Sequence, residues 1–172
     1  RDYAVTGVQT CALPIFIKLT PQIADITAAA AAVKRSGADG VCAINTVKGI
    51  IGVDLDTYSP YPEVNGKSCI GGISGAAIKP VALRCVAEIA RKVDIPITAT
   101  GGISNWRDAV EFLLLGARNL QLCTLVMQHG FRVIEDLTDG LSIYLEAKGF
   151  DSVEQLVGLA LPNLVEHSQL PR

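Results

Sequence analysis

The chain has 172 residues, of which 49% are hydrophobic and 19% charged, and its formal net charge is −2. This composition supports a buried core and excludes an intrinsically disordered chain. We expect no nucleic-acid binding, because no cluster of Lys and Arg is present to neutralise phosphates. We also expect no membrane insertion, because no apolar run approaches the ~18 residues that a membrane span needs.

The first fifteen residues show neither the two-residue period of a strand nor the 3.6-residue period of a helix. Their sequence, ending in VTGVQTCALPI, matches the translation of a common sequencing adapter. We therefore expect Arg1–Ile15 to be foreign to the native protein, which would continue upstream of Phe16. Residues 16–160 are expected to form one folded unit, and residues 161–172 a loose tail.

From Phe16 onward, short apolar strands alternate with amphipathic helices. FIKLT (16–20) predicts a strand, residues 23–37 a helix that ends at Gly37, and GVCAIN (40–45) a second strand. The Gly-rich residues 46–78 predict a long irregular loop, and loops of that length tend to be functional. Residues 79–93 predict the next helix.

The second half repeats this alternation. IPITAT (95–100) predicts a third strand, and Asn105 with Asp108 predicts the N-terminal cap of a helix that ends near Gly116. Residues 118–124 predict a fourth strand, and residues 131–149 and 152–160 two more helices. The chain is therefore predicted to be an α/β protein with four βα units and parallel strands. A doubly wound sheet and half of a TIM (β/α)8 barrel both fit this pattern.

Small, polar or cationic residues stand where the predicted strands end, which is where parallel α/β folds place their sites. Lys18 lies in the first strand, Asn45 and Thr46 follow the second, and Cys123 and Thr124 end the fourth. Two glycine clusters, residues 71–75 and Gly101-Gly102, suit a phosphate held by backbone N–H groups. Tight turns alone would also explain the glycines. The Lys18 ammonium, expected to be buried, needs an anion or a carboxylate partner.

Five cysteines are present, but none form a C-x-x-C pair, and the two histidines lie far apart. We therefore expect no metal site within the chain. Unclustered cysteines favour a reducing compartment, so a cytoplasmic location is expected.

Taken together, these motifs resemble dihydroorotate and dihydropyrimidine dehydrogenases, which are FMN-binding (β/α)8 barrels. The resemblance covers residues 16–157 and rests on motifs that occur in the same order: KLTP (18–21), GADGV (37–41), NT (45–46), GGISG (71–75), IKPVALR (78–84) and TGGI (100–103). Three further segments are more similar to dihydropyrimidine dehydrogenases: NTV (45–47), QLCT (121–124) and FRVIEDL (131–137).

The resemblance implies a role for each matching residue. FMN would be held by Lys18, Gly75, Thr100, Gly101, Gly102, Cys123 and Thr124, with Lys18 at the flavin ring and the others around the phosphate. The pyrimidine base would be bound by Asn45, Thr46 and Ser74. The family reaction is hydride exchange between FMN and uracil or thymine, with a loop cysteine as the proton donor.

The resemblance also implies what this chain does not carry. The catalytic cysteine belongs to the first half of the barrel, and none of the five cysteines here can be assigned to it. Iron–sulfur clusters and an NAD/FAD-binding partner subunit are expected only in missing segments or in that partner, and the full-length enzyme is expected to be an oligomer. A half barrel has two open sheet edges and an expected apolar inner face, so this chain alone is predicted to be inactive and to self-associate.

Three alternatives stay open at this point. The parent could be a dihydroorotate dehydrogenase of pyrimidine biosynthesis. It could instead be a phosphate-binding barrel without redox chemistry, in which Lys18 forms a Schiff base. The chain could also be an inactive remnant.

Overall fold

The computed structural model describes residues 14–170 of the chain. Most of the segment that we expect to be foreign, Arg1–Ile15, lies outside the described residues, so that expectation stays a prediction.

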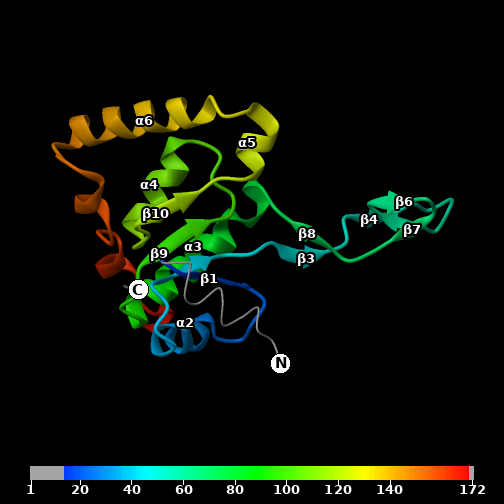
Figure 1. Ribbon diagram of the computed structural model, residues 1–172, viewed down its shortest axis with the longest axis horizontal. Coiled ribbons are helices and arrows are strands. Elements are labelled where there is room, and N and C mark those ends of the chain that lie inside the picture. Colours follow the sequence, from blue (N-terminus) through cyan, green and yellow to red (C-terminus); the bar gives the residue numbers. More distant parts are fainter. Residues whose placement is uncertain (1–13, 171–172) are drawn as a thin grey trace.

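Four parallel strands form the central sheet, in the order β1-β2-β9-β10. The strands are β1 (Phe16–Leu19), β2 (Gly40–Ala43), β9 (Ile97–Thr100) and β10 (Asn119–Gln121). The intervening helices are α2 (Ile26–Arg35), α3 (Lys79–Lys92) and α4 (Trp106–Leu114), which lie side by side along the sheet (Figure 1). The predicted α/β class, the parallel strands and the four βα units are confirmed.

One face of the sheet forms the core with the helices. Leu19, Val41 and Ile97 are buried on that face and belong to the same apolar cluster as Ile26 of α2 and Ile89 of α3. Successive side chains of a strand point to opposite faces, so the residues between these core positions point away from the helices.

This second face is largely polar. Lys18, Cys42, Thr98 and Asn119 pair in register across the four strands, which places them on one face. The expectation of an apolar inner face was therefore wrong. The polar residues of this face occupy every second position of the strands. In the sequence each strand looks like a short apolar run with polar interruptions, and this hides the alternation.

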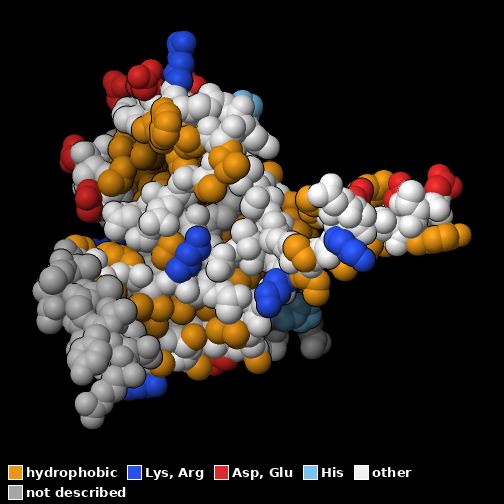
Figure 2. Space-filling view, turned by 45° about the vertical axis from the view of Figure 1, so that its right-hand side comes forward, with side chains coloured by type: hydrophobic (Ala, Val, Ile, Leu, Met, Phe, Trp, Pro, Cys, Tyr) orange, Lys and Arg blue, Asp and Glu red, His pale blue; other side chains and the backbone are white. Residues whose placement is uncertain are grey.

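Residues 46–74 form an arm that projects from the body (Figure 1). The expectation of an irregular loop was wrong, because three antiparallel ladders build the arm. They pair β3 (Val47–Gly49) with β8 (Gly71–Ile73), β4 (Gly52–Val53) with β5 (Pro60–Tyr61), and β6 (Glu63–Val64) with β7 (Lys67–Ser68). Apolar side chains lie exposed along it, among them Ile51 (80%), Leu55 (83%) and Tyr58 (83%) (Figure 2).

The C-terminal region begins with α5 (Thr124–His129), a short helix that the sequence pattern did not indicate, and continues with α6 (Val133–Lys148), which packs on α4. In place of the expected helix at 152–160, only a 3-10 turn, Val153–Leu156, is helical. Two more 3-10 turns, Leu161–Asn163 and His167–Gln169, follow in the tail. Among residues 14–170, no helix combines the length and the apolar character that crossing a membrane requires.

Candidate functional site

A cavity of about 360 Å³ opens at the carboxyl end of the sheet, where β9 and β10 run into the turns that follow them. This volume is within the usual range for small-molecule sites. Of the ten residues predicted to bind cofactor or substrate, nine line this one cavity: Lys18, Thr46, Ser74, Gly75, Thr100, Gly101, Gly102, Cys123 and Thr124. Segments far apart in the sequence thus converge on a single site, as expected where parallel strands end together.

Among the described residues, those that line the cavity include one charged side chain, the ammonium of Lys18, and no carboxylate. The lining therefore favours an anionic or electron-rich ligand. The expectation that Lys18 is buried was wrong, because its side chain is exposed; within residues 14–170 its strand, β1, pairs with β2 alone. Burial raises the pKa of the Cys42 thiol beside it in register, and the Lys18 ammonium opposes that rise.

Three glycines shape the cavity wall with backbone that other residues rarely adopt. Gly75, Gly101 and Gly102 have φ values of 76°, 124° and 84°. At Gly102, an added Cβ would lie 2.7 Å from the backbone N and Cα of Lys79, so the two turns are in direct contact. The glycines can therefore serve both as tight turns and as part of a ligand site. The close approach of Gly102 to the Lys79 backbone, which requires the turn, also forms the cavity wall.

The other glycine cluster divides between two tasks. Gly72 lies in β8, and a side chain there would collide with the side chain of Thr46. Gly71 and Gly72 do not line the cavity, whereas Gly75 does. Gly72 therefore makes room for Thr46 within the arm, nothing lies within 4 Å of a Cβ added at Gly71, and of these three glycines only Gly75 reaches the site.

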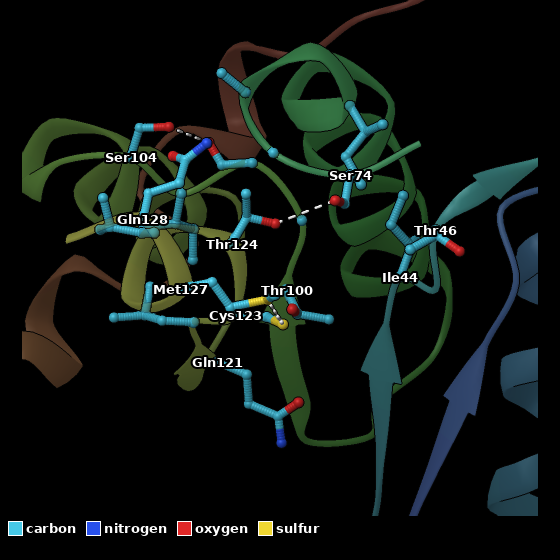
Figure 3. A pocket seen from close by; sticks show the side chains of 18 of the residues that line it. Ile44, Thr46, Ser74, Thr100, Ser104, Gln121, Cys123, Thr124, Met127 and Gln128 are labelled. Atoms are coloured by element: carbon cyan, nitrogen blue, oxygen red, sulfur yellow. Dashed lines mark hydrogen bonds between the residues drawn. The ribbon is translucent and has the colours of Figure 1, made fainter. Parts of the chain in front are cut away.

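The first turn of α5 lines the cavity through Thr124 and Leu125. Cys123 is the residue before the helix, and its side chain makes no capping hydrogen bond. The first N–H groups of a helix have no intrahelical acceptor, so they are available to an anion. Thr124 Oγ1 donates to Ser74 Oγ at 3.2 Å, and the two side chains face each other across the cavity (Figure 3). This bond links the end of the arm to the start of α5.

Asn45 is the predicted site residue that does not line the cavity. Its side-chain oxygen accepts a hydrogen bond from the backbone N–H of Thr46 at 2.8 Å, and its own N–H donates to the carbonyl of Leu19. Asn45 therefore shapes the turn that presents Thr46, which does line the cavity.

Sequence reasoning missed several residues of this region. Gln121, Met127 and Gln128 also line the cavity. Gln121 Oε1 accepts a hydrogen bond from Cys42 Sγ at 3.1 Å, a contact that spans β9. Gln121 was predicted only as part of a strand, and the two-residue period does indicate that it shares a face with Asn119.

A partly buried ion pair next to the cavity was also missed. Lys79 Nζ lies 2.6 Å from Asp108 Oδ1 and 2.9 Å from Glu111 Oε2, and the hydrogen bond to Asp108, then that to Glu111, raises the pKa of Lys79. The predicted cap of α4 is confirmed, since Asn105 Oδ1 accepts from the N–H groups of Arg107 and Asp108. Among residues 14–170, no group of His, Cys, Asp and Glu has the arrangement of a metal site.

Comparison with known proteins identifies the family of the chain. A family model described as dihydroorotate dehydrogenase matches residues 3–145. The chain belongs to the dihydroorotate dehydrogenase family.

Two relatives are similar to this chain over most of its length. The NAD-dependent dihydropyrimidine dehydrogenase subunit PreA of Escherichia coli (strain K12) is 50% identical over 163 residues, which cover 93% of this chain and 40% of the relative. The catalytic subunit of dihydroorotate dehydrogenase B (NAD(+)) of Pyrococcus horikoshii is 49% identical over 148 residues, covering 86% of this chain and 47% of the relative. The chain thus spans less than half the length of these relatives.

Proposed function

We propose that this chain is the cofactor-binding, C-terminal half of a (β/α)8 barrel in an FMN-dependent dihydropyrimidine dehydrogenase. One observation carries the proposal: nine of the ten residues to which the sequence resemblance gives a role in binding cofactor or substrate converge on one cavity, and within residues 14–170 its lining has one cation and no carboxylate. Four consecutive parallel βα units are what half of such a barrel contains. The expected domain limits, with residues 16–160 as the binding unit, are part of this proposal.

The residues present fit an FMN phosphate. Thr124 at the start of α5 and the positive-φ turn at Gly101 and Gly102 line the same cavity, and the free backbone N–H groups there would be the donors to the phosphate. A side chain at Gly75 would come within 3.3 Å of Thr124 Cγ2 and would narrow this cradle. Thr100 would donate its hydroxyl from the end of β9.

The remaining roles follow from position. The Lys18 ammonium would stabilise negative charge on the flavin ring, and Thr46 and Ser74 would hydrogen-bond the pyrimidine base, with Asn45 orienting Thr46. Bound FMN would accept or deliver a hydride at the base, and this is the chemistry that the chain's own side chains do not supply. No residue of this chain is assigned as the proton donor, and the catalytic cysteine is proposed to lie upstream.

Partners are proposed from the relatives' names. The Escherichia coli relative is named as an NAD-dependent subunit. We infer an NAD/FAD-binding partner subunit, iron–sulfur clusters outside this chain, an oligomeric full-length enzyme and a cytoplasmic location. Dihydroorotate dehydrogenase is the alternative, favoured by the 49% identity to the Pyrococcus horikoshii catalytic subunit. Uracil and orotate distinguish the two, because only orotate carries a carboxylate.

Flavin titration of the purified chain tests the proposal. We expect FMN to bind with quenching of its fluorescence, and Lys18→Met to weaken binding of both FMN and riboflavin by about tenfold, because both carry the ring. Lys48→Met, which removes an exposed lysine of the arm, is the matched control and should change neither affinity. Uracil, but not orotate, should perturb the bound flavin's absorbance.

Other outcomes decide against the proposal. A chain that binds no FMN contradicts it. Trapping of a carbonyl substrate on Lys18 by borohydride would support a Schiff-base barrel instead. Perturbation by orotate alone would favour the dihydroorotate enzyme.

A further inference from the structure

A single buried carboxylate joins two turns of the cavity wall. Asp108 lies in the first turn of α4 and is 5% exposed. Its Oδ2 accepts hydrogen bonds from the backbone N–H of Ser104 at 2.7 Å and from Asn105 Nδ2 at 3.2 Å. Its Oδ1 accepts from Lys79 Nζ at 2.6 Å. Asp108 does not itself line the cavity.

The two turns that Asp108 joins are those that form the glycine-rich side of the cavity. Lys79 is the first residue of α3 and directly follows the 3-10 turn Ala76–Ile78 after Gly75. Ser104 ends the turn that begins with Gly101 and Gly102. The backbone of Lys79 touches Gly102 so closely that no Cβ fits there. The distance between the turns is therefore set by this contact and by the bonds to Asp108.

The bonds that Asp108 accepts from Ser104, Asn105 and Lys79 are called the clamp from here on. The Lys79 ammonium makes the clamp compatible with an anion nearby. A lone buried carboxylate beside the cavity would repel a phosphate. The Lys79 ammonium lies 2.6 Å from Asp108 Oδ1 and offsets the charge of this buried carboxylate, whereas Glu111, the second carboxylate on Lys79, has a side chain that is 45% exposed, so water screens the remaining negative charge. An uncompensated buried charge would also be unfavourable by itself.

We propose that Asp108 is a positioning residue that holds the Gly101–Ser104 turn and the start of α3 in the geometry that binds the flavin phosphate. This inference rests on the proposed function and adds to it the side chain that fixes the phosphate subsite. Small displacements of binding groups strongly reduce their effect, so loosening this clamp reduces affinity for the phosphate and leaves the ring contacts at Lys18 in place.

The test compares FMN with riboflavin, which has the same ring and no phosphate. Asp108→Asn keeps the side-chain shape but leaves one oxygen to serve both the Ser104 N–H and the Lys79 ammonium. It is expected to raise the Kd for FMN about tenfold and to leave the Kd for riboflavin unchanged. Glu111→Gln is the matched control. It makes the same carboxylate-to-amide change at the other partner of Lys79, without a bond to the turn, and should leave both Kd values unchanged.

Each outcome is decisive. Equal weakening of FMN and riboflavin by Asp108→Asn would show a merely structural role, and no weakening of FMN would overturn the inference. If Asp108→Asn does not fold, the double variant Lys79→Met/Asp108→Asn, which leaves no unpaired buried charge, carries the same expectation. If the unmutated chain binds no flavin, the proposed function fails. Amide hydrogen exchange then still tests the clamp, because it does not depend on flavin binding. Exchange at Ser104 should increase in Asp108→Asn and not in Glu111→Gln, and unchanged exchange would refute the clamp.

Discussion

Gly102 shows how one residue couples the fold to the candidate site. Its φ of 84° is unfavourable for any residue with a Cβ, and that Cβ would lie 2.6 Å from Lys79 Cβ and 2.7 Å from the Lys79 backbone. We expect Gly102→Ala to reduce the free energy of unfolding by about 3 kcal/mol, from backbone strain plus the clash. Urea denaturation of the purified chain measures this loss.

Gly37→Ala separates the two contributions to that loss. Gly37 has a similar φ of 81°, but nothing lies within 4 Å of an added Cβ. Only the backbone strain applies, so a loss of about 1 kcal/mol is expected. If Gly102→Ala and Gly37→Ala reduced the free energy of unfolding equally, the contact with Lys79 would not contribute to the loss at Gly102.

At the residue scale, the sequence predicted which residues meet but not how they are held. Strand ends and glycines locate the site because parallel strands end at a common edge, and nine of the ten predicted residues do line one cavity. The clamp between Lys79 and Asp108 joins residues 29 positions apart, and no local period relates them. The exposure of Lys18 also depends on which strands flank β1, and this is a property of the whole sheet.

The arm carries its own pH-dependent element. Asp54 follows β4 and accepts hydrogen bonds from the N–H groups of Thr57 and Asp56 and from the Tyr61 hydroxyl. These bonds, the one from the Thr57 N–H above all, lower the pKa of Asp54 from 3.8 to about 2. A lowered folded-state pKa stabilises the turn above the unfolded value of 3.8, and this contribution is lost as the pH falls through about 2.

We therefore expect the turn between β4 and β5 to open as the pH falls from about 4 to about 2. The amide chemical shift of Thr57, followed by NMR through this range, measures the opening. Asp54→Asn should abolish the transition, whereas Asp56→Asn leaves the three bonds to Asp54 in place and should preserve it. A transition that survives Asp54→Asn would assign it to another group.

At the element scale, long periodic segments were predictable and short ones were not. The helices of the body are buried at the 3.6-residue spacing that their sequences predict, whereas the strands were recognised as short apolar runs, and β2 and β9 are buried at every position. The arm was missed because its ladders are two or three residues long and the pair Val47 with Ile73 is set by contacts distant in sequence. Helix α5 was missed because it follows β10 almost directly, without a side-chain cap.

For the whole molecule, the consequence of this topology is a sheet with two edges. Within residues 14–170, β1 and β10 each pair with a strand on one side only. The N–H of Arg118 donates to the carbonyl of Ile97, so in the alternating pattern of a parallel ladder the N–H of Asn119 points away from β9. An edge of this kind can pair with another chain.

We expect the isolated chain to self-associate in a concentration-dependent manner, as measured by size-exclusion chromatography with light scattering. Asn119→Lys places a charge on the edge strand β10 and should shift the chain toward monomer, because charged side chains on an edge strand oppose its pairing with another chain. Asn163→Lys makes the identical change at an exposed residue of a 3-10 turn and controls for the added charge itself. If both variants reduce association equally, net charge is the cause and not the edge. If neither does, the exposed apolar arm becomes the surface to alter, and a chain that is monomeric at every concentration would show that neither edge pairs.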